Sequence, residues 1–446
     1  MINDLVNFFK DKKILILGFG REGQSTYKFI RKYLQDQHIY IADQKDSFDI
    51  LNQDKNITLI SGPNYMDNLE QYDVIMKTPG ISFVGLDTSK FINKVKSELE
   101  LLLEFFDSKT IGVTGTKGKS TTSSLIYKVL KDQGIKTLFL GNIGIPAFDF
   151  VDDIEKDTTI VLEMSSHQLE FMKKSPNISI LLNAFPEHLD HYESYEKYVE
   201  AKCNIYKYQN ENDYFMYNID NETLNKMVND PIAKTFKVSL NSENDADIVV
   251  KDDYICVDNE KMYNINNPRK LKGSYNLNNI MFVIGVAKIL GLDLQKTSES
   301  INSFETLPHR LEFVGKYDDV LYYDNSIATI PQATIEAVKA LENVNCLIIG
   351  GMDRGIDYTD LINFINKTDI GNIVCLPKTG HDIASKITNN KVYLAKDLFE
   401  AVSISKKVTE KGKICLLSPA AASYGFFKNF EERGDKFKEL VKTNEV

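Results

Sequence analysis

The sequence lacks the features that mark secreted and membrane-spanning proteins. Its five cysteines are scattered without CxxC spacing, which is typical of a reduced, cytoplasmic protein without a metal site built on sulfur. No apolar run approaches the ~18 residues that a transmembrane helix needs. The opening stretch MINDLVNFFKDKK contains acidic side chains and no small-residue cleavage motif, unlike a secretory signal. We therefore expect a cytoplasmic chain without a membrane span.

The chain also lacks an excess of basic residues. Its 53 Lys and Arg are outnumbered by 63 Asp and Glu, for a net charge of −10. This balance argues against nucleic acid as the main partner, although a local basic pocket for phosphates remains compatible with it. Fixed-period repeats and low-complexity segments are absent as well. At 446 residues the chain is long enough for two to four domains.

What the sequence does contain is a regular alternation of strand-like and helix-like segments. Buried strands such as KILILG, KTIGVT and NVNCLIIGG are each followed by a glycine turn or a polar segment, and most are followed by a helical pattern. This alternation predicts an α/β fold with mostly parallel sheets. We expect three domains, over residues 1–107, 108–306 and 307–446. Short alternating segments between 235 and 265 predict a small antiparallel side sheet.

A first glycine cluster, LGFGREG, follows one strand and opens a helix. Gly18, Gly20 and Gly23 would let the backbone approach a pyrophosphate at the helix N-terminus. Asp43 ends the next strand, 20 residues after Gly23, where an acidic residue can bind a ribose or a base. The pattern fits NAD, and thus a dehydrogenase, but it fits a UDP-sugar equally well. A tight turn that needs glycine only for packing is the remaining alternative.

A second glycine cluster, GVTGTKGKSTT, resembles a phosphate-binding loop but has Val113 where the strict pattern requires glycine. It lies between a strand and a helix, where backbone N–H groups and the helix dipole favour anions. Lys119 can reach the β- and γ-phosphates of a nucleotide, and Lys117 adds positive charge. Ser120 or Thr121 can offer a hydroxyl to Mg²⁺. A lysine-rich surface turn is the alternative to a nucleotide site.

A magnesium-nucleotide site also needs oxygen ligands. Glu163 closes the strand TTIVLE, and His188 lies just past the strand ISILL. The carboxyl ends of parallel strands meet at one edge of a sheet, so both residues are expected near the glycine loop. Lys202 lies on the following helix, and by composition alone it is a solvated lysine.

Several longer motifs make the chain resemble the Mur ligase family. They run in family order and span the whole chain: GFGREG, IAD, TPGI, TGTKGKST, GNIGIPA, LEMSSHQLE, NAFPEHLDHY with EAKCNIY, LPHRLEFV, GGMDRG, and LSPAAASYGFFKNFEERGDKF. The resemblance implies a Rossmann-like N-terminal domain for a UDP substrate and a central P-loop mononucleotide-binding domain. A Rossmann-like C-terminal domain would close over ATP and bind an amino acid. In this family the nucleotide loop is shorter at its start, so Gly115 takes the place of the missing glycine.

The resemblance also implies roles for individual residues. The nucleotide is expected to contact Gly115, Thr116, Lys117, Gly118, Lys119, Ser120, Thr121, Thr122, Asn142, Asn276, Asn279, Arg310 and Asp353. Two Mg²⁺ ions are expected on Ser120, Thr121, Glu163, His188 and a carbamylated Lys202, and the catalytic residues would be Lys119, His188 and Lys202. Substrates are expected near Gly20, Glu22, Asp43, Gln44, Thr78, Gly80, Asn142, Ser165, Thr329, Arg354, Ser423 and Phe430.

The activity implied is that of family members that use ATP to add D-glutamate to UDP-N-acetylmuramoyl-L-alanine in cell-wall synthesis. An acyl phosphate would be the intermediate, and the enzyme would act as a monomer on small molecules. Two positions depart from the family form: Tyr275 replaces a histidine, and Ile327 replaces a lysine in DNSIATI. L-glutamate is therefore an alternative substrate. A folylpolyglutamate synthase-type ligase and an inactive nucleotide-binding homologue are further alternatives.

Overall fold

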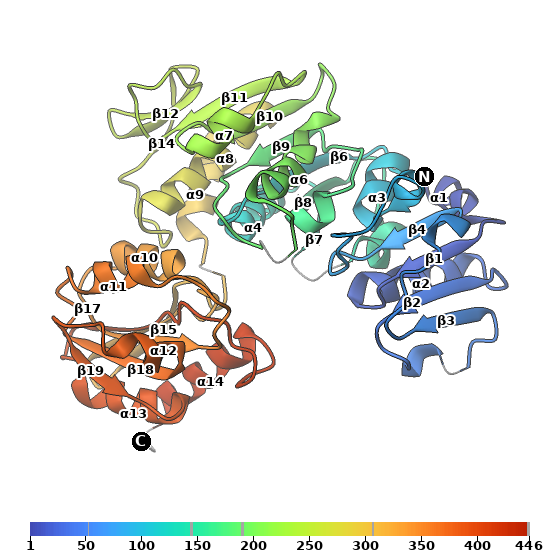
Figure 1. The fold of residues 1–446 in the computed structure, drawn as a ribbon. Helices are drawn as coiled ribbons and strands as arrows, with labels where there is room; N and C mark the ends of the chain where they lie inside the picture. Colours follow the sequence, from blue (N-terminus) through green and yellow to red (C-terminus); the bar gives the residue numbers. More distant parts are fainter. Residues whose placement is uncertain (52, 143–145, 189–190, 306, 444–446) are drawn as a thin grey trace. The chain divides into compact units, whose positions relative to one another are not determined.

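The computed structural model describes residues 1–51, 53–142, 146–188, 191–305 and 307–443. They form three β-sheets in two compact units (Figure 1). The first unit, residues 1–268 and 278–302, holds the N-terminal and central sheets, and the second, residues 269–277 and 303–446, holds the C-terminal sheet. An α/β fold with parallel sheets is thus confirmed. The domain boundaries at 107 and 306 stay predictions, and Thr306 itself lies outside the described residues.

The N-terminal sheet is parallel, in the order β3-β2-β1-β4-β5. Its strands are β1 (Ile14–Leu17), β2 (Ile39–Asp43), β3 (Ile57–Ser61), β4 (Val74–Lys77) and β5 (Val95–Lys96), and its helices are α1 (Ile2–Phe9), α2 (Arg21–Tyr33) and α3 (Glu98–Phe105). All four residues of β1 are buried, as expected for a central parallel strand that is covered on both faces.

The central sheet has the order β14-β13-β12-β11-β10-β9-β6-β8-β7. Its strands are β6 (Lys109–Thr114), β7 (Thr137–Gly141), β8 (Thr159–Glu163), β9 (Ile178–Leu181), β10 (Tyr214–Asn218), β11 (Lys234–Ser239), β12 (Ile248–Lys251), β13 (Tyr254–Val257) and β14 (Glu260–Asn264). Its helices are α4 (Lys119–Asp132), α5 (Ser166–Leu169), α6 (Tyr195–Lys207), α7 (Glu222–Met227), α8 (Ser274–Leu290) and α9 (Leu294–Ser303).

The strands between 248 and 264 pair antiparallel, as the sequence predicts. They do not form a separate side sheet, however, because β12 pairs in parallel with β11 and so continues the central sheet. That part of the prediction is wrong. The alternation of apolar and polar residues in a strand indicates which of its faces is buried, but it does not indicate which strand pairs with it.

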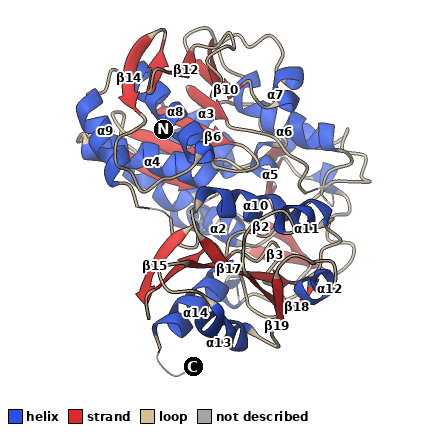
Figure 2. Cartoon of the chain, turned by 90° about the vertical axis from the view of Figure 1, so that its left-hand side faces the viewer, coloured by secondary structure: helices blue, strands red, loops and turns tan. Residues whose placement is uncertain are grey.

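The C-terminal sheet has the order β15-β16-β20-β17-β18-β19. Its strands are β15 (Glu312–Tyr317), β16 (Val320–Asp324), β17 (Val344–Gly351), β18 (Asn372–Lys378), β19 (Lys391–Leu394) and β20 (Ile414–Leu417), and its helices are α10 (Pro331–Ala340), α11 (Thr359–Ile365), α12 (Thr379–Ala384), α13 (Leu398–Val408) and α14 (Phe430–Lys442). Helices α10 and α11 pack on one face and α13 and α14 on the other (Figure 2). Only β15 runs antiparallel to its neighbour.

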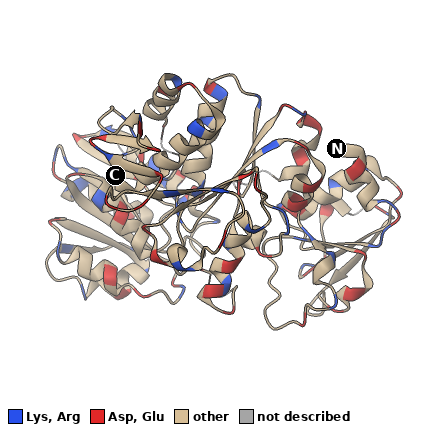
Figure 3. Cartoon of the chain, turned by 90° about the horizontal axis from the view of Figure 1, so that it is seen from above, with Lys and Arg blue, Asp and Glu red and all other residues tan. Residues whose placement is uncertain are grey.

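Acidic and basic residues are interspersed over the elements of the chain (Figure 3). Among the described helices, none combines the length and the apolar character needed to cross a bilayer. All five cysteines are buried and unpaired. In α/β proteins, ligands bind at the carboxyl ends of the parallel strands. Most of the predicted site residues lie in the loops that follow these strands in the three sheets.

Candidate functional site

The second glycine cluster forms a tight loop between β6 and α4. Gly115 has φ 157° and Gly118 has φ 88°, and a Cβ on Gly115 would lie 2.9 Å from Leu182 Cβ. Glycine is therefore required at Gly115 for backbone conformation and space alike. The residues from Gly115 to Gly118 form the loop, and Lys119, Ser120, Thr121 and Thr122 form the first turn of α4. The first turn of a helix presents free N–H groups, which suits an anion.

Two lysines converge on the carbonyl oxygen of Gly115. Lys119 Nζ donates to it at 2.8 Å and Lys202 Nζ at 3.1 Å, from α4 and α6 respectively. Lys202 is only 1% exposed. Burial, together with the nearby Lys119 charge, lowers the pKa of the Lys202 ammonium well below its ordinary value. A buried amine of this kind is readily deprotonated, and the reading of Lys202 as a solvated surface residue is wrong.

Asn183, which follows β9, clamps this loop and was not singled out by the sequence. Its Oδ1 accepts from the N–H of Lys117 at 2.9 Å, and its Nδ2 donates to the Lys117 carbonyl at 3.0 Å. Next to it, Thr116 Oγ1 lies 2.8 Å from the hydroxyl of Tyr198, another residue that the sequence reading missed. Asn183 opens the motif NAFPEHLDHY and lies two residues after the buried strand β9, but neither feature by itself gives it a role.

Lys117 forms an ion pair with Glu187, 3.0 Å between Nζ and Oε1. Burial acts to raise the pKa of the Glu187 carboxyl, but the charges of Lys117, His188 and Lys119 outweigh it and hold the pKa below its ordinary value. The loop and the first turn of α4 thus carry the positive charges of Lys117 and Lys119, which favours a phosphate chain.

Glu163 provides a buried carboxylate at the same edge of the central sheet. It ends β8, is 2% exposed, and its Oε1 accepts from Asn142 Nδ2 at 2.7 Å. Its Oε2 is buried and has no hydrogen-bond partner among the described residues. An unsatisfied buried carboxylate oxygen is costly unless a cation or ligand completes it. The donor set of Glu163 with the hydroxyls of Ser120 and Thr121 fits a hard, oxygen-preferring cation such as Mg²⁺.

His188 lies in a cluster of aromatic side chains. Its ring centroid is 4.7 Å from that of His167, which in turn lies 4.2 Å from that of His191. The side chain of His188 is 38% exposed, and its backbone φ is 58°. Burial, with the neighbouring histidines, lowers the pKa of His167 to about 3, so this ring is neutral at physiological pH. The ring of Tyr198 lies 6.2 Å from that of His188 and 4.6 Å from Lys202 Nζ, so His188 and Lys202 share this neighbour.

The first glycine cluster is built differently. Gly18 has φ 88°, and a Cβ on it would lie 2.1 Å from Thr78 Oγ1, while a Cβ on Gly23 would lie 2.2 Å from the Gly18 carbonyl. Both glycines are thus needed for packing. Gly20 and Gly80, in contrast, have nothing within 4 Å of such a Cβ, so both face open space. The open sides of Gly20 and Gly80 leave room for a ligand at this turn.

The other predicted substrate residues of the N-terminal domain lie at the carboxyl ends of β2 and β4 or at the start of α2. Asp43 Oδ2 accepts from the N–H of Phe19 at 2.7 Å, which links the end of β2 to the glycine turn. Gln44 is the next residue, and Thr78 N donates to the Leu17 carbonyl at 2.9 Å. Glu22 Oε1 accepts from Gln168 Nε2 at 2.6 Å. Burial raises the pKa of Glu22 to about 7.

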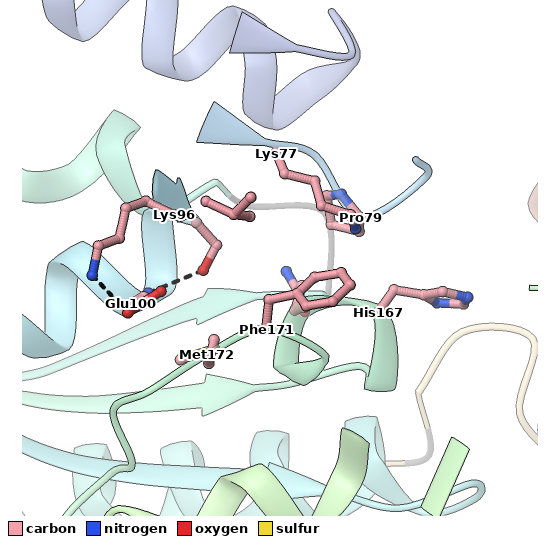
Figure 4. A pocket seen from close by; sticks show the side chains of 10 residues that line it. Lys77, Pro79, Lys96, Glu100, His167, Phe171 and Met172 are labelled. Atoms are coloured by element: carbon pink, nitrogen blue, oxygen red, sulfur yellow. Dashed lines mark hydrogen bonds and ion pairs between the residues drawn. The ribbon is translucent and has the colours of Figure 1, made fainter. Parts of the chain in front are cut away.

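A small cavity of about 10 Å³, room for one water, lies between the N-terminal and central sheets (Figure 4). Lys77 and Pro79 line it from β4 and the loop after it, and His167 and Phe171 from α5 and its C-terminal extension. Lys77 Nζ lies 3.7 Å from Glu170 Oε2. The predicted Ser165 caps α5 through the N–H of Gln168. This segment therefore connects the two sheets of the first unit.

A larger cavity, of about 480 Å³, lies beside the nucleotide loop. Phe185, Tyr195 and Asn221 are among its lining residues. The backbone N–H of Phe185 donates to Thr116 Oγ1 at 2.9 Å, so the wall of this cavity also supports the loop.

In the second unit, Thr329, Asp353, Arg354, Ser423 and Phe430 all follow strands at the carboxyl edge of the C-terminal sheet. Arg354 is exposed, and Ser423 is buried with its carbonyl accepting from the N–H groups of Phe426 and Phe427. Asp353 Oδ1 accepts from the N–H of Gly355 at 2.8 Å. Arg310 lies before β15, two residues from its start. The structure thus gathers four loops of predicted residues along one sheet edge.

Arg433 holds two of these loops together and was not predicted. It is 1% exposed and donates to the carbonyls of Ser326 and Ala421, at 2.8 and 3.1 Å. Burial lowers the pKa of its guanidinium to about 10. Nearby, the buried Asp324 accepts from His309 Nδ1 at 2.8 Å. Arg433 lies in the motif FEERGDKF, but the motif alone gives the arginine no role.

Asn276 and Asn279 lie three residues apart near the start of α8 and so share one face of that helix. Asn279 is 1% exposed, and Asn276 Nδ2 donates to the Lys272 carbonyl at 2.9 Å. Their predicted contact with adenine stays a prediction.

The described geometry defines an α/β protein with a glycine loop that can bind a phosphate chain, next to a buried lysine, Lys202, and a buried carboxylate, Glu163. Comparison with known proteins identifies its family. Residues 113–287 match the Mur ligase middle domain. The UDP-N-acetylmuramoylalanine–D-glutamate ligase of Clostridium kluyveri is 33% identical over 458 aligned positions, which cover 98% of each chain. The chain therefore belongs to the Mur ligase family.

Two solved structures share the fold at lower identity. A MurF ligase from Thermotoga maritima in complex with ADP has a TM-score of 0.61 at 18% identity, covering 97% of this chain and 95% of its own. The UDP-N-acetylmuramate–alanine ligase MurC of the same organism has a TM-score of 0.61 at 17% identity, covering 96% and 98%. At these identities the likeness concerns the fold alone, and it extends along almost the whole chain.

Proposed function

We propose that this chain is an ATP-dependent ligase that joins D-glutamate to the carboxylate of UDP-N-acetylmuramoyl-L-alanine during peptidoglycan precursor synthesis in the cytoplasm. The observation that carries the proposal is the convergence of Lys119 and Lys202 on Gly115, at the same sheet edge as the unsatisfied Oε2 of Glu163. The full-length similarity to ligases of that name supports the choice of substrates. The positive nucleotide loop suits ATP.

We further propose that the chain holds Mg²⁺ at two positions. Glu163 with Ser120 and Thr121 would hold one ion beside the nucleotide phosphates, and His188 with Lys202 would hold a second. Lys202 could act as a ligand only after losing its charge, and its lowered pKa supports carbamylation of the neutral amine by CO₂. When bound, the ions would supply Lewis-acid stabilisation of the phosphate charges.

The chain's own residues would then position the reactants. Lys119 would neutralise charge as the γ-phosphoryl group passes from ATP to the alanine carboxylate, which forms an acyl phosphate and releases ADP. The amine of glutamate would attack the acyl carbon, lose a proton, and expel inorganic phosphate, so that one amide forms for each ATP cleaved. Positioning and electrostatic stabilisation would provide most of the acceleration, since no protein nucleophile is needed.

The remaining predicted contacts divide between the two units. Residues 1–107 would bind the UDP portion beside the open faces of Gly20 and Gly80, and residues 108–306 would bind ATP. Residues 307–446 would contribute Arg310 and Asp353 to the nucleotide and the edge with Thr329, Arg354, Ser423 and Phe430 to the amino acid. Closure of this part over the acyl phosphate would exclude water.

A phosphate-release assay tests the proposal. The purified chain is incubated with ATP, Mg²⁺, UDP-N-acetylmuramoyl-L-alanine and either D- or L-glutamate. We expect phosphate and an amide product with D-glutamate. A product with L-glutamate alone would mean that the substrate is L-glutamate and that Ile327 accompanies this change of enantiomer. No product with either enantiomer would refute the proposed ligase activity.

The carbamate is tested separately with Lys202→Ala. We expect turnover to fall by about 100-fold or more, and to recover in part when a short-chain carboxylic acid is added, because the acid can replace the carbamate oxygens. Lys207→Ala, on the exposed side of the same helix α6, is the matched control and should keep its activity. Loss of activity without any rescue would leave Lys202 as a structural residue.

A further inference from the structure

The carboxyl edge of the C-terminal sheet is formed by four neighbouring parallel strands. In spatial order they are β16, β20, β17 and β18. The first three are followed by the residues expected at the incoming amino acid: Thr329 after β16, Ser423 and Phe430 after β20, and Arg354 after β17. The fourth strand ends in Lys378, to which neither the sequence motifs nor the proposed reaction gives a role. Figure 1 shows β18 beside β17 and followed by α12.

The four loops are bonded into one surface. Arg433 connects the carbonyls of Ser326 and Ala421, the loops after β16 and β20. Met352 and Ala422 form an isolated β-bridge between the loops after β17 and β20. Thr379 Oγ1 lies 3.1 Å from both the N and the O of Gly351, which joins the end of β18 to the loop after β17. Lys378 is therefore part of this surface, and is paired in register with Gly351.

The backbone of Lys378 is strained. It has φ 62° and ψ −115°, a conformation that residues with a Cβ rarely adopt. Such strain persists only when the surrounding structure holds it, and the next residue, Thr379, is bonded to both the N and the O of Gly351. Glycine would adopt this conformation at lower cost. A lysine at a position that favours glycine points to a use for its side chain.

The ammonium group of Lys378 is directed toward the loop after β20. Its Nζ lies 5.3 Å from the ring centroid of Phe426, in the turn closed by the Ser423 carbonyl. The Phe426 ring is 46% exposed and restrains the ammonium by a cation–π contact. Within the described part of the chain, no carboxylate lies within ion-pair distance of this Nζ. The charge is thus held beside Phe426, in the turn that begins at Ser423, without a carboxylate to neutralise it.

The chemistry of the substrate calls for a second cation at this edge. An acidic amino acid brings two carboxylates, and position 327, on the loop after β16, holds the uncharged Ile327. Arg354 can pair with one carboxylate. We infer that Lys378 binds the other carboxylate of the incoming dicarboxylic amino acid and so takes over the role of a charge at position 327. This inference rests on the proposed ligase function.

Lys378→Met tests the inference in the assay described above. We expect the KM for glutamate to rise about tenfold, as for the loss of a charge-assisted hydrogen bond, with the KM for ATP unchanged. Lys378→Arg should retain most of the affinity. Lys391→Met, at the amino end of β19, controls for the loss of any lysine from this sheet. Lys428→Met, in the loop after β20, controls for the general positive potential of the edge.

Lys378→Gly distinguishes a role of the Lys378 side chain in binding from a role in stability. It removes the ammonium while relieving the backbone, so we expect the same rise in KM together with a Tm equal to or higher than that of the unsubstituted chain. A merely structural lysine would show the opposite combination, an unchanged KM with a lower Tm. An unchanged KM for both Lys378→Met and Lys378→Gly, or an equal rise for Lys428→Met, would overturn the inference.

A binding measurement keeps this test independent of turnover. Glutamate is titrated against the chain in the presence of ADP, Mg²⁺ and UDP-N-acetylmuramoyl-L-alanine, and the ligand-induced rise in Tm is recorded. We expect the rise in the unsubstituted chain and its loss in Lys378→Met. If the unsubstituted chain binds glutamate but forms no product, the ligase proposal fails while the assignment of Lys378 stands. An identical rise in Lys378→Met overturns the assignment whatever the activity.

Discussion

The two glycine turns of the first unit begin alike and are completed differently. Both join a buried parallel strand to a helix, at β1–α2 and at β6–α4. Around the first turn, Gly18 and Gly23 are fixed by close packing, and Asp43 binds the backbone of Phe19. Around the second, Lys119, Lys202 and Asn183 surround the loop with side chains from three different elements. The glycines make each turn possible, and the surrounding side chains decide what it can bind.

The difference in charge follows from these surroundings. Lys117 and Lys119 make the β6–α4 loop positive, which suits a nucleoside triphosphate and its metal ions. The β1–α2 turn has an acidic residue at the end of β2 and an open face at Gly20, which suits a neutral or hydroxyl-bearing part of a ligand beside its diphosphate. A UDP-sugar meets that description. Family membership and this second nucleotide loop together disfavour the NAD-dependent dehydrogenase that the first turn alone allowed.

The largest expected effect is on the chemistry at the second turn. Lys119→Ala removes a cation that we propose lies beside the nucleotide phosphates, and we expect ligase turnover to fall by about 100-fold or more, with the fold intact by circular dichroism. Lys131→Ala, in the last turn of the same helix α4, should retain full turnover. If Lys119→Ala kept its activity, the proposal that the β6–α4 loop binds the reacting phosphates would be contradicted.

The next effect concerns stability at the first turn. Gly18→Ala would place a methyl group 2.1 Å from Thr78 Oγ1 at φ 88°, so we expect the free energy of unfolding to fall by about 2–4 kcal/mol. Gly20→Ala is the matched control, because its Cβ would meet no atom within 4 Å and its φ is −73°. Chemical denaturation of both variants measures the difference. Equal losses would show that packing does not distinguish the two glycines.

Much of the difference between the surroundings of the two glycine turns could not be predicted from the sequence. Strands such as ILIL and the glycine turns after them were predictable, because buried parallel strands are continuous apolar runs and the turns require glycine. The residues Glu163 and His188 could be expected at the sheet edge from their place after strands. Asn183 and Arg433 lie in family motifs, but their roles could not be predicted, since these roles come from contacts with residues more than ten positions away, which local patterns do not encode.

The burial of Lys202 could not be predicted from its local sequence either. Its sequence surroundings are those of an ordinary lysine on a surface helix, yet the side chain is 1% exposed. Only the resemblance to the family predicted a special role for it. Likewise, the pairing of β11 with β12 could not be predicted from the pattern of either strand.

A smaller effect is expected from loosening the second turn without removing its charges. Asn183→Ala deletes both hydrogen bonds to the Lys117 backbone, and we expect the KM for ATP to rise about tenfold, with kcat changed less. Steady-state kinetics at saturating amino acid measures this. Asn204→Ala is a suitable control, because that asparagine also bonds backbone carbonyls, of Leu169 and Glu170, away from the loop. A change in kcat alone would mean that the clamp acts on the reaction rather than on nucleotide binding.

The smallest expected effect depends on pH and concerns Glu22, at the start of the helix that follows the first turn. Its pKa is about 7 in the folded chain, because burial disfavours the charged form, against an ordinary value of 4.5. Between these two values the folded chain holds a proton that the unfolded chain has released. The contribution of Glu22 to the free energy of unfolding should therefore fall as pH rises from about 4.5 to 7, and stay level above it.

Glu22→Gln removes this titration while keeping an oxygen to accept from Gln168 Nε2. Relative to the unsubstituted chain, the variant should gain stability as pH rises from 5 to 8, by about 1–3 kcal/mol at the upper end. Denaturation curves at pH 5, 6.5 and 8 measure the gain, and Glu70→Gln, on an exposed segment of the same domain, should show none. A constant difference across this range would mean that Glu22 stays ionised in the fold. The first turn would then offer its ligand a negative charge at the start of α2 as well as at Asp43, and the contrast with the positive loop at Gly115 would be sharper still.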